Sequence, residues 1–158
     1  MDFEFEEIIT KVGLYLATFL VCLVSGFLPL VNAELYLVSI SAISSKSVAL
    51  PVILLSTSGQ MTAKSIIYLA GRGFLNLPLG KYEKKIEKVR ETFAKWQNKI
   101  DLLIFMSAFL GFPPFFIVSI LAGMQKLNFR RFFIFGFFGR LLRFAITFLF
   151  PQLIKGFI

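Results

Sequence analysis

Three charged residues inside apolar segments are the best candidates for chemistry in this 158-residue sequence. Glu34 is the only carboxylate well inside an apolar region, and Arg140 and Arg143 lie within the last long apolar stretch. Ionised groups at membrane depth need an opposite charge, a carbonyl or water. Because the arginines are three residues apart, they share one helical face, and we expect that face to meet Glu34 or a bound phosphate. The predicted chemistry is electrostatic binding; the alternative is a structural ion pair with Glu34.

Two further residues complete the candidate site. Gln60, with Lys64, makes the middle of one apolar stretch more polar than a lipid-facing helix requires. Gly59 and Ala63 in the same stretch favour close approach of another helix, so packing is an alternative role. Arg72 ends this stretch, either as a site residue or as a marker of the membrane boundary.

The composition restricts the class of protein. Apolar residues make up 57% of the chain and charged residues 16%, whereas soluble domains carry about a quarter charged residues. The mean hydropathy is +0.79 and the formal charge is +8. There is no His and one Cys, which excludes a His-based triad, a His-ligated metal site and an internal disulfide. We expect an integral membrane protein with no enzyme activity, no cofactor, no metal and no nucleic-acid partner.

The apolar pattern predicts two spanning helices, at 48–71 and 128–150, because each stretch is about 20 residues long. Two other regions, 8–45 and 101–125, are interrupted by breaks that leave pieces of mostly 10–14 residues. Pieces of this length suit the legs of re-entrant hairpins, although a Pro-kinked span is an alternative for 101–125. The predicted hairpin tips contain Pro29, Asn32, Pro113 and Pro114.

An internal repeat supports this organisation. Val38–Lys46 matches Val118–Lys126 at five of nine positions with an offset of 80 residues. We therefore predict an all-α membrane domain over 1–158, built as an inverted repeat of two units. Each unit has one re-entrant hairpin and one spanning helix, which is a plan typical of transporters.

A basic segment at 81–100 joins the two predicted units. Its apolar residues recur every three or four positions, which predicts an amphipathic helix lying in the membrane interface against anionic headgroups. Lys126, Arg130 and Arg131 form a second basic cluster. If 101–125 re-enters, both clusters lie on the cytoplasmic side, as the positive-inside rule favours. We expect the cytoplasmic (inner) membrane of a prokaryote; the side of the N-terminus stays open. The apolar positions are Tyr82, Ile86, Val89, Phe93, Trp96 and Ile100.

The order and spacing of these features resemble the DedA superfamily, also called VTT or SNARE-associated membrane proteins, and within it the short YqaA-type branch. The resemblance covers about residues 10–150. In the first half it rests on a Pro-containing break, an acidic residue, a Gly-containing span and a Tyr-x-x-Gly-Arg ending, here Pro29, Glu34, Gly59 and Tyr68-Leu69-Ala70-Gly71-Arg72. In the second half it rests on Pro113-Pro114, Ala122-Gly123-Met124, Phe129-Arg130-Arg131-Phe132 and Gly139-Arg140-Leu141-Leu142-Arg143-Phe144.

The resemblance implies two facing re-entrant hairpins and movement of lipid between leaflets, by scrambling or by transport of isoprenoid phosphate carriers. In some members this movement is linked to the proton motive force. Glu34 matches the acidic residue of the family's first hairpin. Typical members carry two arginines in the second hairpin, and these align with Phe109 and Phe115 here. This departure removes part of the anion site that the resemblance implies.

The leading hypothesis is a lipid transporter or scramblase that moves phospholipid or isoprenoid-phosphate headgroups through a polar groove at the midplane. Arg140 and Arg143 would attract the headgroup, and Glu34 would be the proton-responsive partner. The expected partners are membrane lipids with anionic headgroups, and a homodimer is left open. The alternatives are a proton- or ion-coupled transporter of a small solute and a membrane assembly protein that transports nothing.

Overall fold

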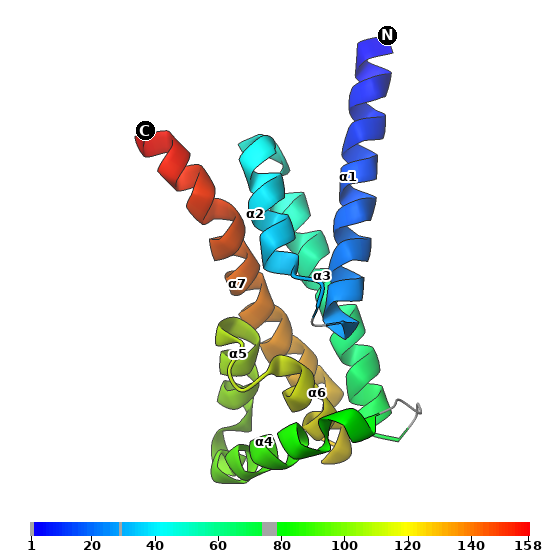
Figure 1. Ribbon diagram of the computed structural model, residues 1–158, viewed down its shortest axis with the longest axis vertical. Helices are drawn as coiled ribbons and strands as arrows, with labels where there is room; N and C mark the ends of the chain where they lie inside the picture. The colour runs from blue at the N-terminus through cyan, green and yellow to red at the C-terminus, as the bar shows by residue number, and fades with distance from the viewer. Residues whose placement is uncertain (1, 29, 74–78) are drawn as a thin grey trace.

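The computed structural model describes residues 2–28, 30–73 and 79–158, and these ranges contain helices and no strand (Figure 1). The predicted all-α fold is therefore confirmed for the described part of the chain. The helices are α1 (Asp2–Phe27), α2 (Ala33–Ile43), α3 (Ala49–Gly71), α4 (Glu83–Lys95), α5 (Ile100–Leu110), α6 (Phe115–Met124) and α7 (Phe129–Phe157). Three short 3₁₀ helices are η1 (Lys46–Val48), η2 (Leu79–Tyr82) and η3 (Gln97–Lys99).

Two pairs of helices lie at opposite ends of the molecule, joined by the long helices α3 and α7 (Figure 1). The pair α1 and α2 occupies the end that holds both termini, and the pair α5 and α6 occupies the end covered by α4. Helix α3 packs against α1, α6 and α7, and α7 packs also against α2 and α5. The turn between α1 and α2 and the turn between α5 and α6 therefore meet midway along α3 and α7.

Helices α1 and α7 are the two in the described ranges that are both long enough and apolar enough to cross a membrane. Helix α1 is continuous over 26 residues, so the first piece of the 8–45 region is longer than the 10–14-residue legs expected there. It continues because no proline interrupts the sequence before Pro29. Its outer surface carries exposed apolar side chains suited to lipid, such as Leu16, which is 60% exposed.

Helix α3, one of the two predicted spans, has 23 residues but a different character. Ser56, Thr57, Gln60 and Lys64 are all buried on it. It is enclosed by other helices, which explains why polar residues are tolerated along it. The sequence pattern therefore identified its length correctly, whereas its place at the centre of the fold depends on the packing.

The two turns between paired helices are stabilised by side-chain hydrogen bonds. The Asn32 side-chain oxygen accepts from the backbone N–H groups of Glu34 (3.0 Å) and Leu35 (3.1 Å), which caps the N-terminus of α2. In the second turn, Gly111 adopts a positive φ of 80° that ends α5, and the Ser107 hydroxyl donates to the Pro113 carbonyl at 2.6 Å. The predicted tip residue Pro29 lies outside the described residues.

Glycines allow the long helices to approach the helix pairs closely. A Cβ atom on Gly59 of α3 would lie 2.6 Å from the Phe19 carbonyl oxygen of α1. A Cβ atom on Gly139 of α7 would lie 2.7 Å from the Phe105 carbonyl oxygen of α5. The prediction that Gly59 serves close packing is confirmed.

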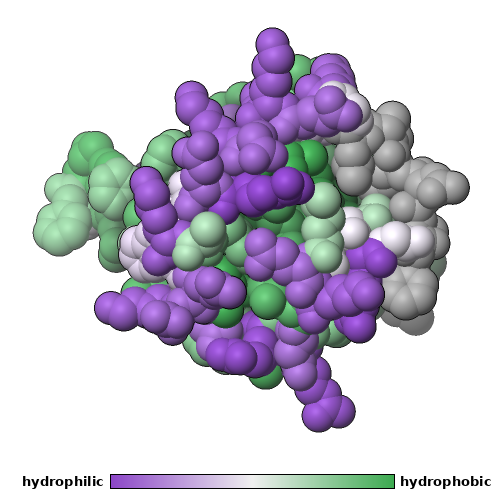
Figure 2. Space-filling view, turned by 90° about the horizontal axis from the view of Figure 1, so that it is seen from below, coloured by the Kyte–Doolittle hydropathy of each residue, from purple (hydrophilic) through white to green (hydrophobic). Residues whose placement is uncertain are grey.

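The amphipathic helix α4 differs from its prediction in what its apolar side contacts. Ile86, Val89 and Phe93 are buried in a cluster with residues of α5 and α6, and α4 packs directly on α6. The apolar stripe therefore packs on the helix pair instead of facing lipid. Packing against protein removes this apolar surface from water, as contact with lipid would. Its polar side is exposed, and Figure 2 shows hydrophilic side chains gathered over this end of the molecule. Basic residues exposed there include Lys84, Lys85, Lys88, Lys126 and Arg130.

Candidate functional site

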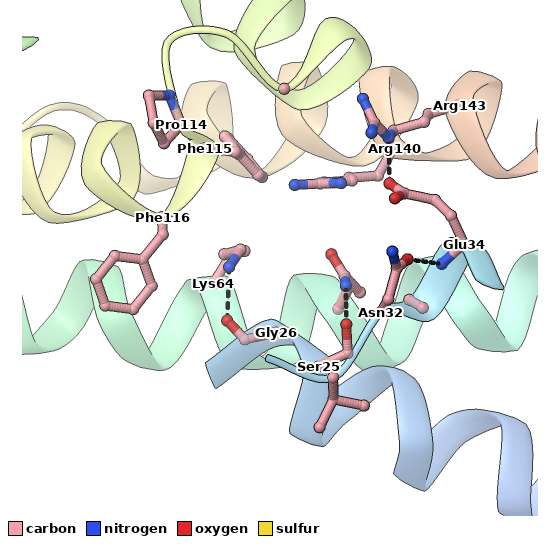
Figure 3. Close-up of a pocket in the computed structure, with 14 residues that line it drawn as sticks. Ser25, Gly26, Asn32, Glu34, Lys64, Pro114, Phe115, Phe116, Arg140 and Arg143 are labelled. Carbon is pink, nitrogen blue, oxygen red and sulfur yellow. Dashed lines mark hydrogen bonds and ion pairs between the residues drawn. The ribbon is translucent and has the colours of Figure 1, made fainter. Parts of the chain in front are cut away.

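A polar cavity of about 270 Å³ lies where the two turns meet, between α3 and α7 (Figure 3). We call it the central cavity. The first turn contributes the end of α1 and the start of α2, and the second contributes the end of α5 and the start of α6. Its polar and turn residues are Ser25, Gly26, Asn32, Glu34, Gln60, Lys64, Gly111, Pro114, Arg140 and Arg143.

Glu34 and Arg143 form an ion pair at the side of the cavity. The distance from Arg143 Nε to Glu34 Oε1 is 2.5 Å, and Arg143 also donates from a terminal nitrogen to the Phe109 carbonyl at 2.9 Å. The Arg143 side chain is 26% exposed and the Glu34 side chain is 34% exposed. The predicted meeting of Glu34 with an arginine of this face is confirmed for Arg143. One guanidinium thereby connects α2, α5 and α7.

Arg140 lies deeper and has no carboxylate partner among the described residues. It is 9% exposed, and its Nε is buried without a hydrogen-bond partner in that part of the chain. The guanidinium carbon lies 5.2 Å from the centre of the Phe115 ring and 6.0 Å from that of Phe144. These cation–π contacts compensate part of the charge. Figure 3 shows Arg140 directed across the cavity from α7.

Lys64 adds a third cation opposite Arg140. It is 5% exposed, its Nζ donates to the Gly26 carbonyl at 2.5 Å, and it lies 5.3 Å from the centre of the Phe116 ring. This lysine connects the end of α1 to the start of α6. Lys64 was not among the predicted site residues, although a lysine in the middle of an apolar helix is a usable signal.

Gln60 lies on α3 one turn before Lys64. Its amide nitrogen donates to the Ser25 hydroxyl at 2.8 Å, and its buried Oε1 has no partner within the described ranges. The predicted site residue therefore lines the cavity and retains an unused acceptor. A ligand or water with a hydrogen-bond donor would satisfy it.

The cavity carries more positive than negative charge. Lys64, Arg140 and Arg143 face a single carboxylate, Glu34, which leaves a formal charge of +2 when the lysine is protonated. The start of α6 lies in the same wall, and Pro114 supplies no side-chain cap for its first N–H groups. These features together favour an anionic ligand. Within the described residues, no group of three or more His, Cys, Asp or Glu side chains is placed to hold a metal ion.

Two of the sequence candidates lie away from this cavity. Arg72 is exposed at the end of α3 and donates to the Tyr68 hydroxyl at 3.0 Å, and that hydroxyl donates in turn to the Leu127 carbonyl. It therefore fastens the end of α3 to the turn before α7. Pro113 does not line the cavity; its carbonyl accepts the bond from Ser107.

The chain matches a protein-family model described as the VTT domain, over residues 28–152. This range includes both turns, α3, most of α7 and every charged residue of the central cavity. Comparisons with curated proteins and with solved structures find no match.

Proposed function

We propose that this chain, which belongs to the VTT-domain family and is an integral membrane protein of the DedA class, moves lipids with anionic headgroups between the two leaflets. The observation that carries the proposal is the central cavity: three cations and one carboxylate gathered where two pairs of helices meet. A phosphate-bearing headgroup is the anion that a membrane supplies in quantity. Its passage needs no bond to be made or broken, so no enzyme activity is proposed.

The energetic role of the cavity follows from the cost of moving a charged headgroup through hydrocarbon, which is prohibitive without polar partners. Arg140 offers an uncommitted guanidinium, and Lys64 and the first N–H groups of α6 lie beside it. Glu34 forms an ion pair with Arg143 and lowers the net positive charge of the cavity, so that a bound headgroup can also dissociate. Protonation of Glu34 would release Arg143, which gives a route to proton linkage.

Positive charge at the second turn comes from α7 in this chain. Phe109 and Phe115 align with the two hairpin arginines of typical family members. Arg143 donates to the carbonyl of Phe109, and Arg140 lies over the ring of Phe115. Each of these positions is therefore reached by a guanidinium from the neighbouring helix, which supports retention of an anion site despite the departure.

We further propose that the two halves form an inverted repeat with re-entrant helix pairs. Ala49 and Phe129, which begin α3 and α7, are 80 residues apart, the same offset as the sequence repeat. Gly59 packs α3 on α1, and Gly139, 80 positions later, packs α7 on α5. The exposed basic residues around α4 support a cytoplasmic position for that end.

The test is leaflet exchange of a headgroup-labelled anionic phospholipid, measured in liposomes that contain the purified protein. We compare the wild type with Arg140→Ala and Glu34→Gln, and use Lys88→Ala, on the exposed side of α4, as a charge-matched control. The proposal predicts exchange by the wild type and the control. It also predicts loss of exchange in Arg140→Ala and altered exchange in Glu34→Gln.

No exchange by folded wild-type protein would refute lipid movement and favour a small-solute transporter or an assembly protein. Uptake of a solute that requires Glu34 but ignores lipid composition would identify the former. Altered partner binding without any flux would identify the latter.

A further inference from the structure

A second polar pocket lies at the end of the molecule opposite α4, between the last turns of α2 and α7. Its volume is about 290 Å³, and we call it the α2–α7 pocket. It is lined by Ser41, Ser44, Ser45, Lys46, Gln152, Lys155 and Gly156. Among the described residues, Lys46 and Lys155 are the charged ones that line it, which gives the pocket a formal charge of +2.

Gln152 is the residue that distinguishes this pocket from an ordinary polar surface. It lies on the final membrane helix, is 6% exposed, and neither its Oε1 nor its Nε2 has a hydrogen-bond partner in the described ranges. A buried amide that lacks both partners is rare in folded proteins and needs a water or a ligand. The amide offers one acceptor and two donors to such a ligand.

Hydrogen bonds between the surrounding groups hold the walls of the pocket in place without using the Gln152 amide. The Ser41 hydroxyl donates to the Phe148 carbonyl at 2.7 Å, which fixes α2 against α7. Lys155 donates to the Ala42 carbonyl near the end of α2. The α2–α7 pocket is thus a junction of two helices whose lining includes a buried amide without partners in the described ranges and two lysines.

The position of the pocket matches the headgroup level of a membrane. Helix α2 begins at the central cavity and ends at this pocket, and its 11 residues span about 16 Å at 1.5 Å per residue. Half of a hydrocarbon core is about 15 Å. With the central cavity at the midplane, as the proposed function requires, the α2–α7 pocket lies at the surface of the leaflet remote from α4.

We infer that the α2–α7 pocket binds the phosphate headgroup of an anionic phospholipid in that leaflet. Lys46 and Lys155 would pair with the phosphate, and Gln152 would bond a headgroup hydroxyl and a phosphate oxygen. Exposed apolar side chains beside the pocket would contact the acyl chains: Ile43 is 82% exposed and Leu153 is 59% exposed. Lipid is therefore favoured over a free anion. This inference rests on the proposed function for its placement in the membrane and adds a holding site at one end of the path.

The experiment counts bound phosphatidylglycerol by native mass spectrometry of the full-length protein, in an Arg140→Met background that removes the deep cation of the central cavity. Gln152→Leu and Lys155→Ala are compared with Lys88→Ala, which lies at the other end of the molecule. Loss of one charge-assisted or buried hydrogen bond predicts an affinity about tenfold lower in each pocket variant. The control variant keeps the parent affinity.

A second measurement separates ligand binding from a purely structural role. If Gln152 serves a ligand, Gln152→Leu removes an unsatisfied amide, and the melting temperature without added lipid stays the same or rises while phosphatidylglycerol binding falls. A lowered melting temperature with unchanged binding would overturn the inference. Binding of inorganic phosphate as tight as that of phosphatidylglycerol would overturn the lipid assignment.

The outcome also distinguishes this inference from the proposed function. If the wild type moves no lipid, the proposed lipid movement is refuted. If phosphatidylglycerol binding nevertheless falls when Gln152 or Lys155 is changed, the α2–α7 pocket is supported. Lipid exchange by the wild type, with unchanged binding in both pocket variants, would refute the α2–α7 pocket alone.

Discussion

Replacement of Arg140 by methionine is expected to stabilise the protein while it removes lipid exchange. Arg140 is 9% exposed and has no carboxylate partner among the described residues. A buried charge left uncompensated costs roughly 3–5 kcal/mol. The cation–π contacts with Phe115 and Phe144 return about 1 kcal/mol each. The difference predicts that Arg140→Met gains about 1–3 kcal/mol.

The matched variant Arg143→Met should have the opposite effect on stability. It leaves Glu34 without its partner and removes the bond to the Phe109 carbonyl, so we expect a loss of about 1–3 kcal/mol. Both variants remove one guanidinium from the same helix and add the same side chain. The sign of the change in unfolding free energy therefore shows whether each arginine stabilises the fold or destabilises it and serves a ligand.

Thermal unfolding of the purified proteins in one detergent measures the change in stability. At about 2–4 °C per kcal/mol, Arg140→Met should raise the melting temperature by about 2–12 °C. Leaflet exchange in liposomes measures the loss of lipid movement, and its rate in Arg140→Met should fall to the protein-free rate. A melting temperature lowered as far as in Arg143→Met would show that Arg140 is structural, and exchange at the wild-type rate would remove it from the lipid path.

Three other predictions follow from single contacts. Gly123→Val should destabilise the protein by about 1–3 kcal/mol or more, because its Cβ would collide with the Tyr68 carbonyl oxygen of α3; unfolding of the variant in detergent checks this. Phe93→Ala should cost about 3 kcal/mol by opening a cavity under α4, and limited proteolysis should then cut α4 first. Glu34→Gln should flatten the pH dependence of exchange, because Arg143 is then unpaired at every pH; a profile like that of the wild type would exclude Glu34 from proton linkage.

The sequence by itself determined that this is an all-helical membrane protein and where most of its helices lie. Runs of apolar residues and the breaks at Asn32 and at Pro113-Pro114 are local features, so the positions of α2, α3, α6 and α7 can be read without tertiary information. The charged residues Glu34, Arg140 and Arg143 were equally visible, because ionised groups are rare in apolar segments. Helix α1 is longer than the 10–14-residue leg expected there, because nothing in the sequence before Pro29 interrupts it.

Only the tertiary structure decided which of these charged residues pair with one another. Helical spacing places Arg140 and Arg143 on one face, but which of them reaches Glu34 depends on the position of α2 against α7. The packing of α4 on α6 and the contact of Lys64 with Gly26 likewise join segments far apart in the chain. Such contacts depend on how whole helices dock, which a pattern of neighbouring residues does not encode. The position of Arg140 without a carboxylate partner among the described residues is therefore a property of the assembled fold.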